Sequence, residues 1–298
     1  MLQGFTPWPP ERVREYTEKG WWENLTLWQM MMRSVERWPN KVALVAGQTR
    51  QTYRDLDRIS AQLGAALMQQ GIRPLDRVVL QLPNTPEFVH YYLALVRIGA
   101  IPVMALRAHR HTEIRHFIAA SGAVAYVVPD VAHKFDYRPM AQEMAQTFAH
   151  LRTVIVVGEP LPGQLAHETL MAAWPDSAAA QFDEHTVFMA ILPLGHNYNL
   201  ASPGMLGTFY YGGTVVLASS TEAADIFALV AQERVSVIAA VVPLIAAWMN
   251  SDELALHDVS SLQVVQNGGA RLAPELRQRL MDRLHCVPQE IYGTAEGL

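Results

Sequence analysis

Residues 78–106, with the sequence VVLQLPNTPEFVHYYLALVRIGAIPVMAL, decide the fold class of this chain. The segment opens with an apolar run, VVLQLP, that is long enough for a buried strand. Apolar residues from Phe88 to Ile98 then recur at helical spacing, Gly99 ends the helix, and IPVMAL is a second apolar run. Two apolar strands joined by an amphipathic helix predict a parallel sheet with both faces covered.

The same alternation continues on both sides of this segment. A helix is predicted at 56–67, and the second half predicts strands at 186–193, 214–219, 235–243, 262–269 and 289–293, with helices at 205–209, 222–233 and 274–284. Residues 159–182 contain Pro, Gly and Ala without a clear period and are interpreted as a connector. We therefore expect an α/β fold of two parallel-sheet subdomains, at 41–182 and 183–298, after a Trp-rich N-terminal arm at 1–40 that packs on the core.

The composition excludes several classes of protein. A net charge of −5 gives no electrostatic attraction to nucleic acid or to an anionic membrane. Cys286 is the only cysteine, so no internal disulfide forms, which suits a reducing cytosol. The N-terminus lacks a basic segment followed by an apolar run, and the longest apolar stretch, 235–249, is too short to span a bilayer. We expect a soluble cytoplasmic protein.

The first candidate site loop, LPLGHNYNLASPG at 192–204, directly follows a predicted strand. In open α/β sheets, ligands bind in the crevice beyond the carboxyl ends of the strands. Its polar and aromatic residues are His196, Asn197, Tyr198 and Ser202. A flat ring with a few hydrogen-bonding partners suits a small aromatic acid. An ordinary polar turn explains the same residues equally well, so spacing alone leaves both interpretations open.

The second candidate loop, QNGGARL at 266–272, lies between a predicted strand and a predicted helix. Gly268 and Gly269 allow the backbone to approach a flat or phosphorylated ligand, and the following helix N-terminus favours an anion. Two glycines also occur in an ordinary tight turn, and this simpler interpretation is favoured for the motif on its own.

The third candidate loop, IYGTAEGL at 291–298, again follows a predicted strand. The ring of Tyr292 is suited to stacking on a base, and the hydroxyl of Thr294 to donating to a phosphate. The carboxylate of Glu296 is a suitable Mg²⁺ ligand. A solvated glutamate in a turn is an equal alternative for this motif on its own.

Other motifs give weaker signals. His109, His111 and His116 do not have the spacing of a usual zinc pair on a helix. No G-x-G-x-x-G follows a strand, so a dinucleotide-dependent oxidoreductase is poorly supported, and no G-x-S-x-G motif of a hydrolase is present.

Taken together, the loops and the opening strands resemble the adenylate-forming superfamily, which includes acyl-CoA synthetases, luciferases and peptide-synthetase adenylation domains. QTYRDLDRISAQLGAAL and the segment quoted first fit its opening pattern. More narrowly, FTPWP, ALRAHRHTEI, HNYNLASPG, GGARL and YGTAEGL resemble the 2,3-dihydroxybenzoate-AMP ligases of catechol siderophore biosynthesis. The resemblance covers essentially the whole chain.

This resemblance implies roles for the residues of the three loops. His196 is implied as a catalytic residue that turns between two reaction steps, and Glu296 as a catalytic residue that binds Mg²⁺. The residues implied for aryl-acid binding are His196, Asn197, Tyr198, Ser202 and Gly268. Those implied for nucleotide binding are Gly268, Gly269, Ala270, Tyr292, Gly293 and Thr294. A serine at position 202 is typical of the dihydroxybenzoate group, whereas salicylate-activating relatives tend to carry cysteine.

The resemblance also implies a reaction. It predicts an enzyme that uses ATP and Mg²⁺ to convert 2,3-dihydroxybenzoate to aryl-AMP and then transfers the aryl group to the phosphopantetheine thiol of an aryl carrier protein. A carboxylate is a weak nucleophile toward ATP, so the enzyme has to align it with the α-phosphate and neutralise the charge that develops there. The alternatives are a salicylate- or benzoate-type adenylase, an aryl-CoA ligase, and a truncated domain that binds aryl acid or nucleotide without turnover.

Two features depart from the family pattern. A Gly/Ser/Thr-rich loop ending in lysine, which wraps the ATP phosphates, is expected before the strand at 186–193. Here Phe182 joins directly to Asp183, and no lysine follows Lys134. The family's third subdomain and its mobile C-terminal domain, with a catalytic lysine, would come after Leu298. Three explanations stay open: residues left out of the sequence, which we favour, a shortened chain, or a degenerate copy.

Overall fold

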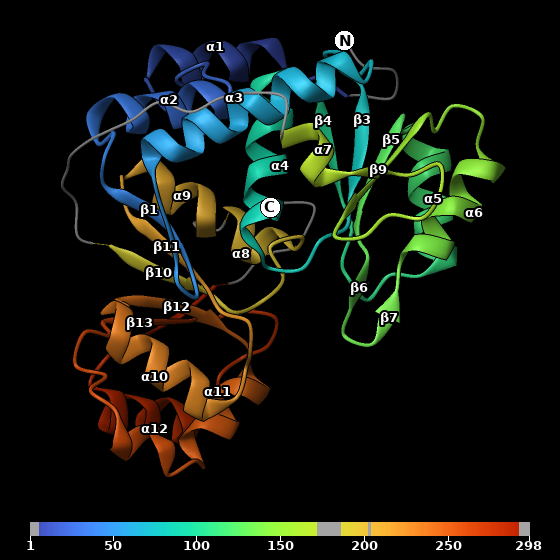
Figure 1. The fold of residues 1–298 in the computed structure, drawn as a ribbon. Coiled ribbons are helices and arrows are strands. Elements are labelled where there is room, and N and C mark those ends of the chain that lie inside the picture. The colour runs from blue at the N-terminus through green and yellow to red at the C-terminus, as the bar shows by residue number, and fades with distance from the viewer. Residues whose placement is uncertain (1–5, 172–185, 202–203, 292–298) are drawn as a thin grey trace.

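The computed structural model describes residues 6–171, 186–201 and 204–291. Their helices and strands form alternating layers (Figure 1). A central layer of helices lies between two sheets, and each sheet carries further helices on its outer face. The predicted α/β class with parallel sheets is confirmed. Within the described ranges, no helix is long and apolar enough to cross a membrane.

The larger sheet has seven strands, parallel except at β2. In spatial order they are β14 (Val287–Glu290), β13 (Val264–Asn267), β12 (Val237–Ala240), β10 (Val187–Ala190), β11 (Thr214–Leu217), β1 (Val42–Ala46) and β2 (Thr49–Thr52). Leu44 of β1 pairs with Val215 of β11. Residues 42–52 therefore share a sheet with the later strands. The predicted division between 182 and 183 lies outside the described residues and stays a prediction.

The smaller sheet has five strands, all parallel. In spatial order they are β4 (Ile101–Met104), β3 (Arg77–Leu80), β5 (Ala125–Pro129), β8 (Thr153–Val157) and β9 (Leu165–Ala166). A short antiparallel pair, β6 (Val131–Ala132) and β7 (Phe135–Asp136), projects beside it. The strand–helix–strand unit predicted at 78–106 is present as β3, a helix and β4.

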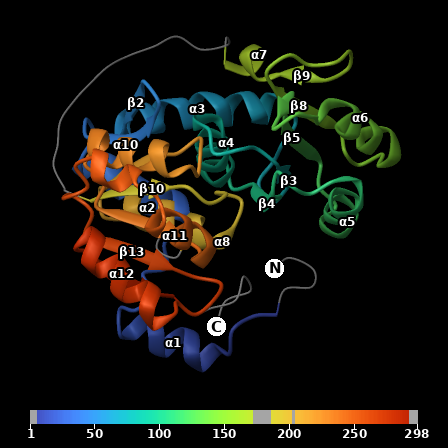
Figure 2. The same ribbon diagram turned by 90° about the horizontal axis from the view of Figure 1, so that it is seen from below.

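Most of the helices fall into three layers around these sheets (Figures 1 and 2). The central layer contains α2 (Leu27–Arg37), α3 (Tyr53–Gln69), α4 (Pro86–Arg97) and α9 (Gly204–Tyr210). The outer face of the larger sheet carries α10 (Ala223–Glu233), α11 (Val242–Met249), the 3₁₀ turn η1 (Glu253–Leu256) and α12 (Pro274–Leu284). The outer face of the smaller sheet carries α5 (His111–Ser121) and α6 (Arg138–Thr147).

The chain forms these helices where its capping and spacing favour them. Thr52 closes the N-terminus of α3, because its Oγ1 accepts from the Asp55 amide at 3.1 Å while Asp55 accepts from the Thr52 amide at 2.8 Å. Apolar residues at helical spacing bury the inner face of α3. The helices predicted at 56–67 and 274–284 are both confirmed.

Three segments differ from the sequence-based expectation. The stretch interpreted as a connector contains β9 and α7 (His167–Met171), and the first candidate loop contains a short helix, α8 (Asn197–Ala201). In the N-terminal arm, α2 buries part of its surface in the central layer, whereas α1 (Pro10–Glu18) has no buried residue. Elements of five residues span too few turns to show a period, which is why α7 and α8 were missed.

Candidate functional site

A cleft of about 620 Å³ lies between the two sheets, at the carboxyl ends of β3, β4, β10 and β11. Its walls come from the loops that follow these four strands, including Asn84, Arg107 and Gly195, and from His133 in the turn between β6 and β7. Loops at the carboxyl ends of parallel strands are the usual ligand-binding position in open α/β sheets. The cleft therefore adjoins the first candidate loop.

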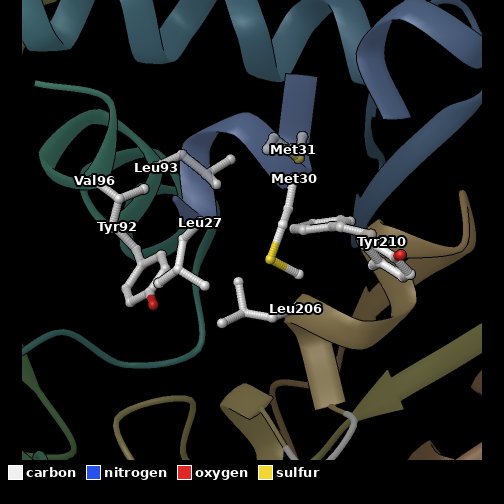
Figure 3. Close-up of a pocket in the computed structure, with 9 residues that line it drawn as sticks. Leu27, Met30, Met31, Tyr92, Leu93, Val96, Leu206 and Tyr210 are labelled. Carbon is white, nitrogen blue, oxygen red and sulfur yellow. The ribbon is translucent and has the colours of Figure 1, made fainter. Parts of the chain in front are cut away.

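A second cavity lies between α2, α4 and α9 (Figure 3). Leu27, Met30 and Leu206 point toward one another across it. Its volume is only about 10 Å³, which is the space of one water molecule, and its lining is apolar apart from two tyrosines. It is a packing gap and not a ligand site.

The first candidate loop leads from β10 into α8. His196 is exposed just before the helix, and its ring Nδ1 accepts a hydrogen bond from the Tyr198 amide at 3.1 Å. Asn197 is half-buried as the first residue of α8. His196, Asn197 and Tyr198 therefore lie together at the start of α8, on the segment that follows β10. Ser202 lies outside the described residues.

Tyr198 reaches from α8 to the neighbouring strand ends. Its hydroxyl donates to the Ala240 carbonyl, at the end of β12, over 3.4 Å. Burial raises the pKa of Tyr198 well above the usual value for a phenol. The side chain is therefore a neutral donor throughout the physiological pH range.

The ring of Tyr198 lies directly against Gly268, the residue that follows β13. A Cβ placed on Gly268 would lie 3.0 Å from Cζ of Tyr198, which is closer than ordinary contact. Gly268 is buried, whereas Gly269 is exposed, has φ +81° and has open space where a side chain would be. The structure thus brings the first two candidate loops into contact.

Two side chains hold the glycine loop in shape. Asn267 donates from Nδ2 to the Ala270 carbonyl at 2.7 Å. Glu290 of β14 accepts from the Leu272 amide at 3.2 Å with one carboxylate oxygen, and from Arg277 of α12 at 3.2 Å with the other. The loop between β13 and α12 is therefore fixed from both ends.

The residues predicted in the third candidate loop, Tyr292, Gly293, Thr294 and Glu296, lie outside the described residues. Their nucleotide and Mg²⁺ roles stay predictions. In the part of the chain that the structure describes, no group of three His, Cys, Asp or Glu side chains is placed to hold a metal ion. In the 109–116 segment, Nδ1 of His109 accepts from the Leu106 amide at 3.1 Å, and the rings of His109 and His116 both contact Phe117.

Sequence reasoning missed the amide side chains that surround the first candidate loop. Asn84, which follows β3, and Asn199, within α8, both donate to backbone carbonyls of this loop. Asn199 lies within the predicted motif but was not singled out there, and only the position of Asn84 after a predicted strand pointed to it.

Comparison with known proteins decides the family. A model for the family described as AMP-binding enzyme matches residues 31–161 and 158–298. The chain belongs to the AMP-binding enzyme family. The resemblance to adenylate-forming enzymes inferred from the sequence motifs is thereby confirmed.

Several relatives of this AMP-binding family member carry the names of aryl-acid ligases. The chain is 36% identical to the 2,3-dihydroxybenzoate-AMP ligase of Bacillus subtilis, with 100% of the chain and 62% of that protein covered. It is 35% identical to the vibriobactin-specific 2,3-dihydroxybenzoate-AMP ligase of Vibrio cholerae, covering 100% and 63%. It is 34% identical to the salicyl-AMP ligase of Mycobacterium tuberculosis, covering 100% and 61%.

Among solved structures, the apo structure of MbtA from Mycobacterium smegmatis is similar, with a TM-score of 0.89 and 30% identity over 99% of this chain and 62% of that one. The chain thus spans about 62% of the length of these relatives. The alignments run over 336 and 340 residues, so stretches of the relatives have no counterpart among the 298 residues of this chain.

Proposed function

We propose that this AMP-binding family member activates an aryl acid, with 2,3-dihydroxybenzoate favoured, and passes the aryl group to the phosphopantetheine thiol of an aryl carrier protein in siderophore biosynthesis. The observation that carries the proposal is the contact between Tyr198 and Gly268 at the strand ends. An aromatic ring beside a position without a side chain is suited to a slot for a planar acid. The names of the relatives support the same substrate class.

The residues proposed for the aryl acid are His196, Asn197, Tyr198, Ser202 and Gly268. Tyr198 would border the aromatic ring, and its neutral hydroxyl adds no negative charge beside the substrate carboxylate. Asn197 and Ser202 would meet the ring hydroxyls, whose pattern distinguishes dihydroxybenzoate from salicylate. His196 directly precedes α8 and would lie near the reacting carboxylate.

The residues proposed for ATP are Gly268, Gly269, Ala270, Tyr292, Gly293 and Thr294. The exposed Gly269 and the open space beside its backbone support this proposal, because they leave room for a flat adenine ring. Glu296 is proposed to bind Mg²⁺, which when bound disperses the negative charge of the phosphates.

The proposed reaction has two steps. A carboxylate oxygen of the aryl acid forms a bond to the α-phosphorus of ATP, the bond from that phosphorus to its bridging oxygen breaks, and pyrophosphate leaves. The carrier thiol, as thiolate, then bonds to the aryl carbonyl carbon, the bond from that carbon to the phosphate oxygen of the mixed anhydride breaks, and AMP leaves with its electron pair. Alignment of the carboxylate by the Tyr198–Gly268 slot would supply part of the rate enhancement.

Exchange of labelled pyrophosphate into ATP tests the first step. With the protein, Mg²⁺ and ATP, exchange should require an aryl acid, be fastest with 2,3-dihydroxybenzoate, and be slower with salicylate and benzoate. H196A should lower the exchange rate while the protein stays folded. Exchange that is equal with and without any aryl acid would reject the proposal.

A second candidate function is binding of an aryl acid or nucleotide without turnover. The direct junction of Phe182 and Asp183, and the absence of lysine after Lys134, favour it, because the expected phosphate-binding loop has no counterpart in the sequence. Calorimetric binding of 2,3-dihydroxybenzoate together with no pyrophosphate exchange would select this candidate. An aryl-CoA ligase is distinguished by offering CoA or a carrier protein as the acceptor and measuring which thioester forms.

A further inference from the structure

Asn84 connects the two sheets beside the first candidate loop. It follows β3 of the smaller sheet, but the hydrogen bonds of its side chain go to the last residue of β10 in the larger sheet and to the loop that follows it. Its Nδ2 donates to the Leu192 carbonyl at 2.8 Å and to the Ala190 carbonyl at 3.4 Å, and its Oδ1 accepts from the Leu194 amide at 2.9 Å. The Asn84 amide thus binds every second residue from Ala190 to Leu194, in the segment that leads to His196.

The carbonyl of Leu192 is held from a second side. Asn199, which is fully buried in α8, donates from Nδ2 to the same oxygen at 2.7 Å. A carbonyl oxygen has two lone pairs, and here each amide can use one of them. The start of the loop is therefore fixed between the smaller sheet and the helix that carries Asn197 and Tyr198.

A second contact between the sheets lies next to this one. A Cβ on Gly195 would lie 3.1 Å from the carbonyl oxygen of Ala105, the residue that follows β4. The loop passes this close to the smaller sheet because Gly195 has no side chain. His196 follows directly, and its amide donates to the Pro193 carbonyl at 3.0 Å.

From these contacts we infer that Asn84 is a positioning residue for the aryl-acid subsite. The inference rests on the proposed function, since it assumes that His196 and Tyr198 contact the aryl acid. Asn84 sets where the loop lies relative to the smaller sheet, and the loop sets the start of α8. A displacement of about 1 Å at a reacting group lowers rates by as much as about 100-fold, so a displaced loop should weaken the binding of the acid measurably.

The test compares N84A and N84D with a neighbouring control, T85A. Thr85 lies on the same loop, and its buried hydroxyl has no hydrogen-bond partner among the described residues, so its removal leaves the contacts to the β10 loop intact. Titration calorimetry measures the Kd of each variant for 2,3-dihydroxybenzoate, and thermal unfolding measures its stability. We expect the Kd of N84A to rise about tenfold and that of T85A to stay within about twofold of wild type.

N84D separates positioning from a general loss of structure. Its carboxylate can still accept from the Leu194 amide, but it faces two carbonyl oxygens and cannot donate to them until it is protonated. The ratio of the Kd of N84D to the Kd of wild type should therefore fall toward one as the pH is lowered from 8 to 5. The same ratio for N84A should not change with pH, because alanine has no group that becomes a hydrogen-bond donor on protonation.

The outcomes are distinct. A wild-type protein that does not bind 2,3-dihydroxybenzoate overturns the proposed function, and with it this inference. Wild-type binding with an unchanged Kd in folded N84A overturns the inference alone. If N84A does not fold, the pH series on N84D decides: a constant ratio of Kd values between pH 8 and 5 contradicts the positioning role.

Discussion

The absence of a side chain at Gly268 is what allows Tyr198 to lie across the end of β13. In G268A, the new Cβ would be 3.0 Å from the ring, so Tyr198 has to move by a few tenths of an ångström. Overpacking of this kind costs about 1–3 kcal/mol. We expect the Kd for 2,3-dihydroxybenzoate to rise roughly tenfold, measured by calorimetry. Unchanged affinity in a folded G268A protein would show that the ring is not part of the subsite.

A second residue-scale prediction concerns pH. His90 is buried in α4, where Nε2 lies 2.8 Å from Oε1 of Gln51, and burial lowers the pKa of His90 from 6.5 to about 4. The unfolded chain therefore takes up a proton at a pH where the folded protein does not. The stability from neutral His90 is fully present above pH 6.5 and is lost as the pH falls toward 4.

This linkage amounts to about 1.4 kcal/mol per pH unit, or roughly 2 kcal/mol between pH 6.5 and 5. Urea unfolding at both pH values measures the free energy of unfolding. Between pH 6.5 and 5, this free energy should fall by about 2 kcal/mol more in wild type than in H90N. The exposed His116 provides the control, since H116N should lose as much as wild type. Equal losses in wild type and H90N would contradict a buried neutral His90.

The site was only partly predictable at the residue scale. The polarity and ring of the 196–198 stretch, and the glycine pair at 268 and 269, are local features that the sequence displays. Their contact is not local, because it requires β10, β12 and β13 to lie side by side. Asn84 was harder still, since its partners are 106 to 110 residues away and an isolated asparagine after a strand has no distinctive pattern.

At the element scale, Gly212 determines how α2 lies against the larger sheet. It precedes β11 with φ +76°, and a Cβ there would lie 2.4 Å from the ring of Trp38, at the C-terminus of α2. G212A combines an unfavourable backbone conformation with a steric clash in the core. We expect it to lower the free energy of unfolding by about 3 kcal/mol or more.

Gly47 gives a matched control for this prediction. It also has a positive φ, of +56°, but no atom lies within 4 Å of a Cβ placed there. G47A therefore carries the backbone cost alone, about 1 kcal/mol. Chemical denaturation should show that the free energy of unfolding falls clearly more in G212A than in G47A. Equal decreases would contradict the role assigned to the Trp38 contact.

The elements were well predicted where they are long and periodic. The unit at 78–106 and the helix at 274–284 combine apolar spacing with Pro or Gly at their ends, so local physics specifies them. The short helices α7 and α8 were not predicted, because each is a little over one turn and depends on packing around it.

At the scale of the whole molecule, Cys286 offers a single reporter of unfolding. It is 6% exposed beside β14, and burial raises its pKa to about 11. The thiol is therefore shielded and protonated at pH 8. We expect its reaction with an aromatic disulfide reagent to be at least about 100-fold slower in the native protein than in denaturant. Prompt reaction of the native protein would mean that this edge of the larger sheet opens readily.

The pairing of β1 with β11 has a consequence for the synthesis of this chain. Val42 and Thr214, joined by a hydrogen bond of 2.6 Å, are 172 residues apart. A ribosome that adds about 5–20 residues per second would release the apolar strand at 42–46 on the order of ten seconds or more before its partner exists. The nascent chain thus carries an unpaired strand edge for that time, a surface on which chaperones could act and from which aggregation could start.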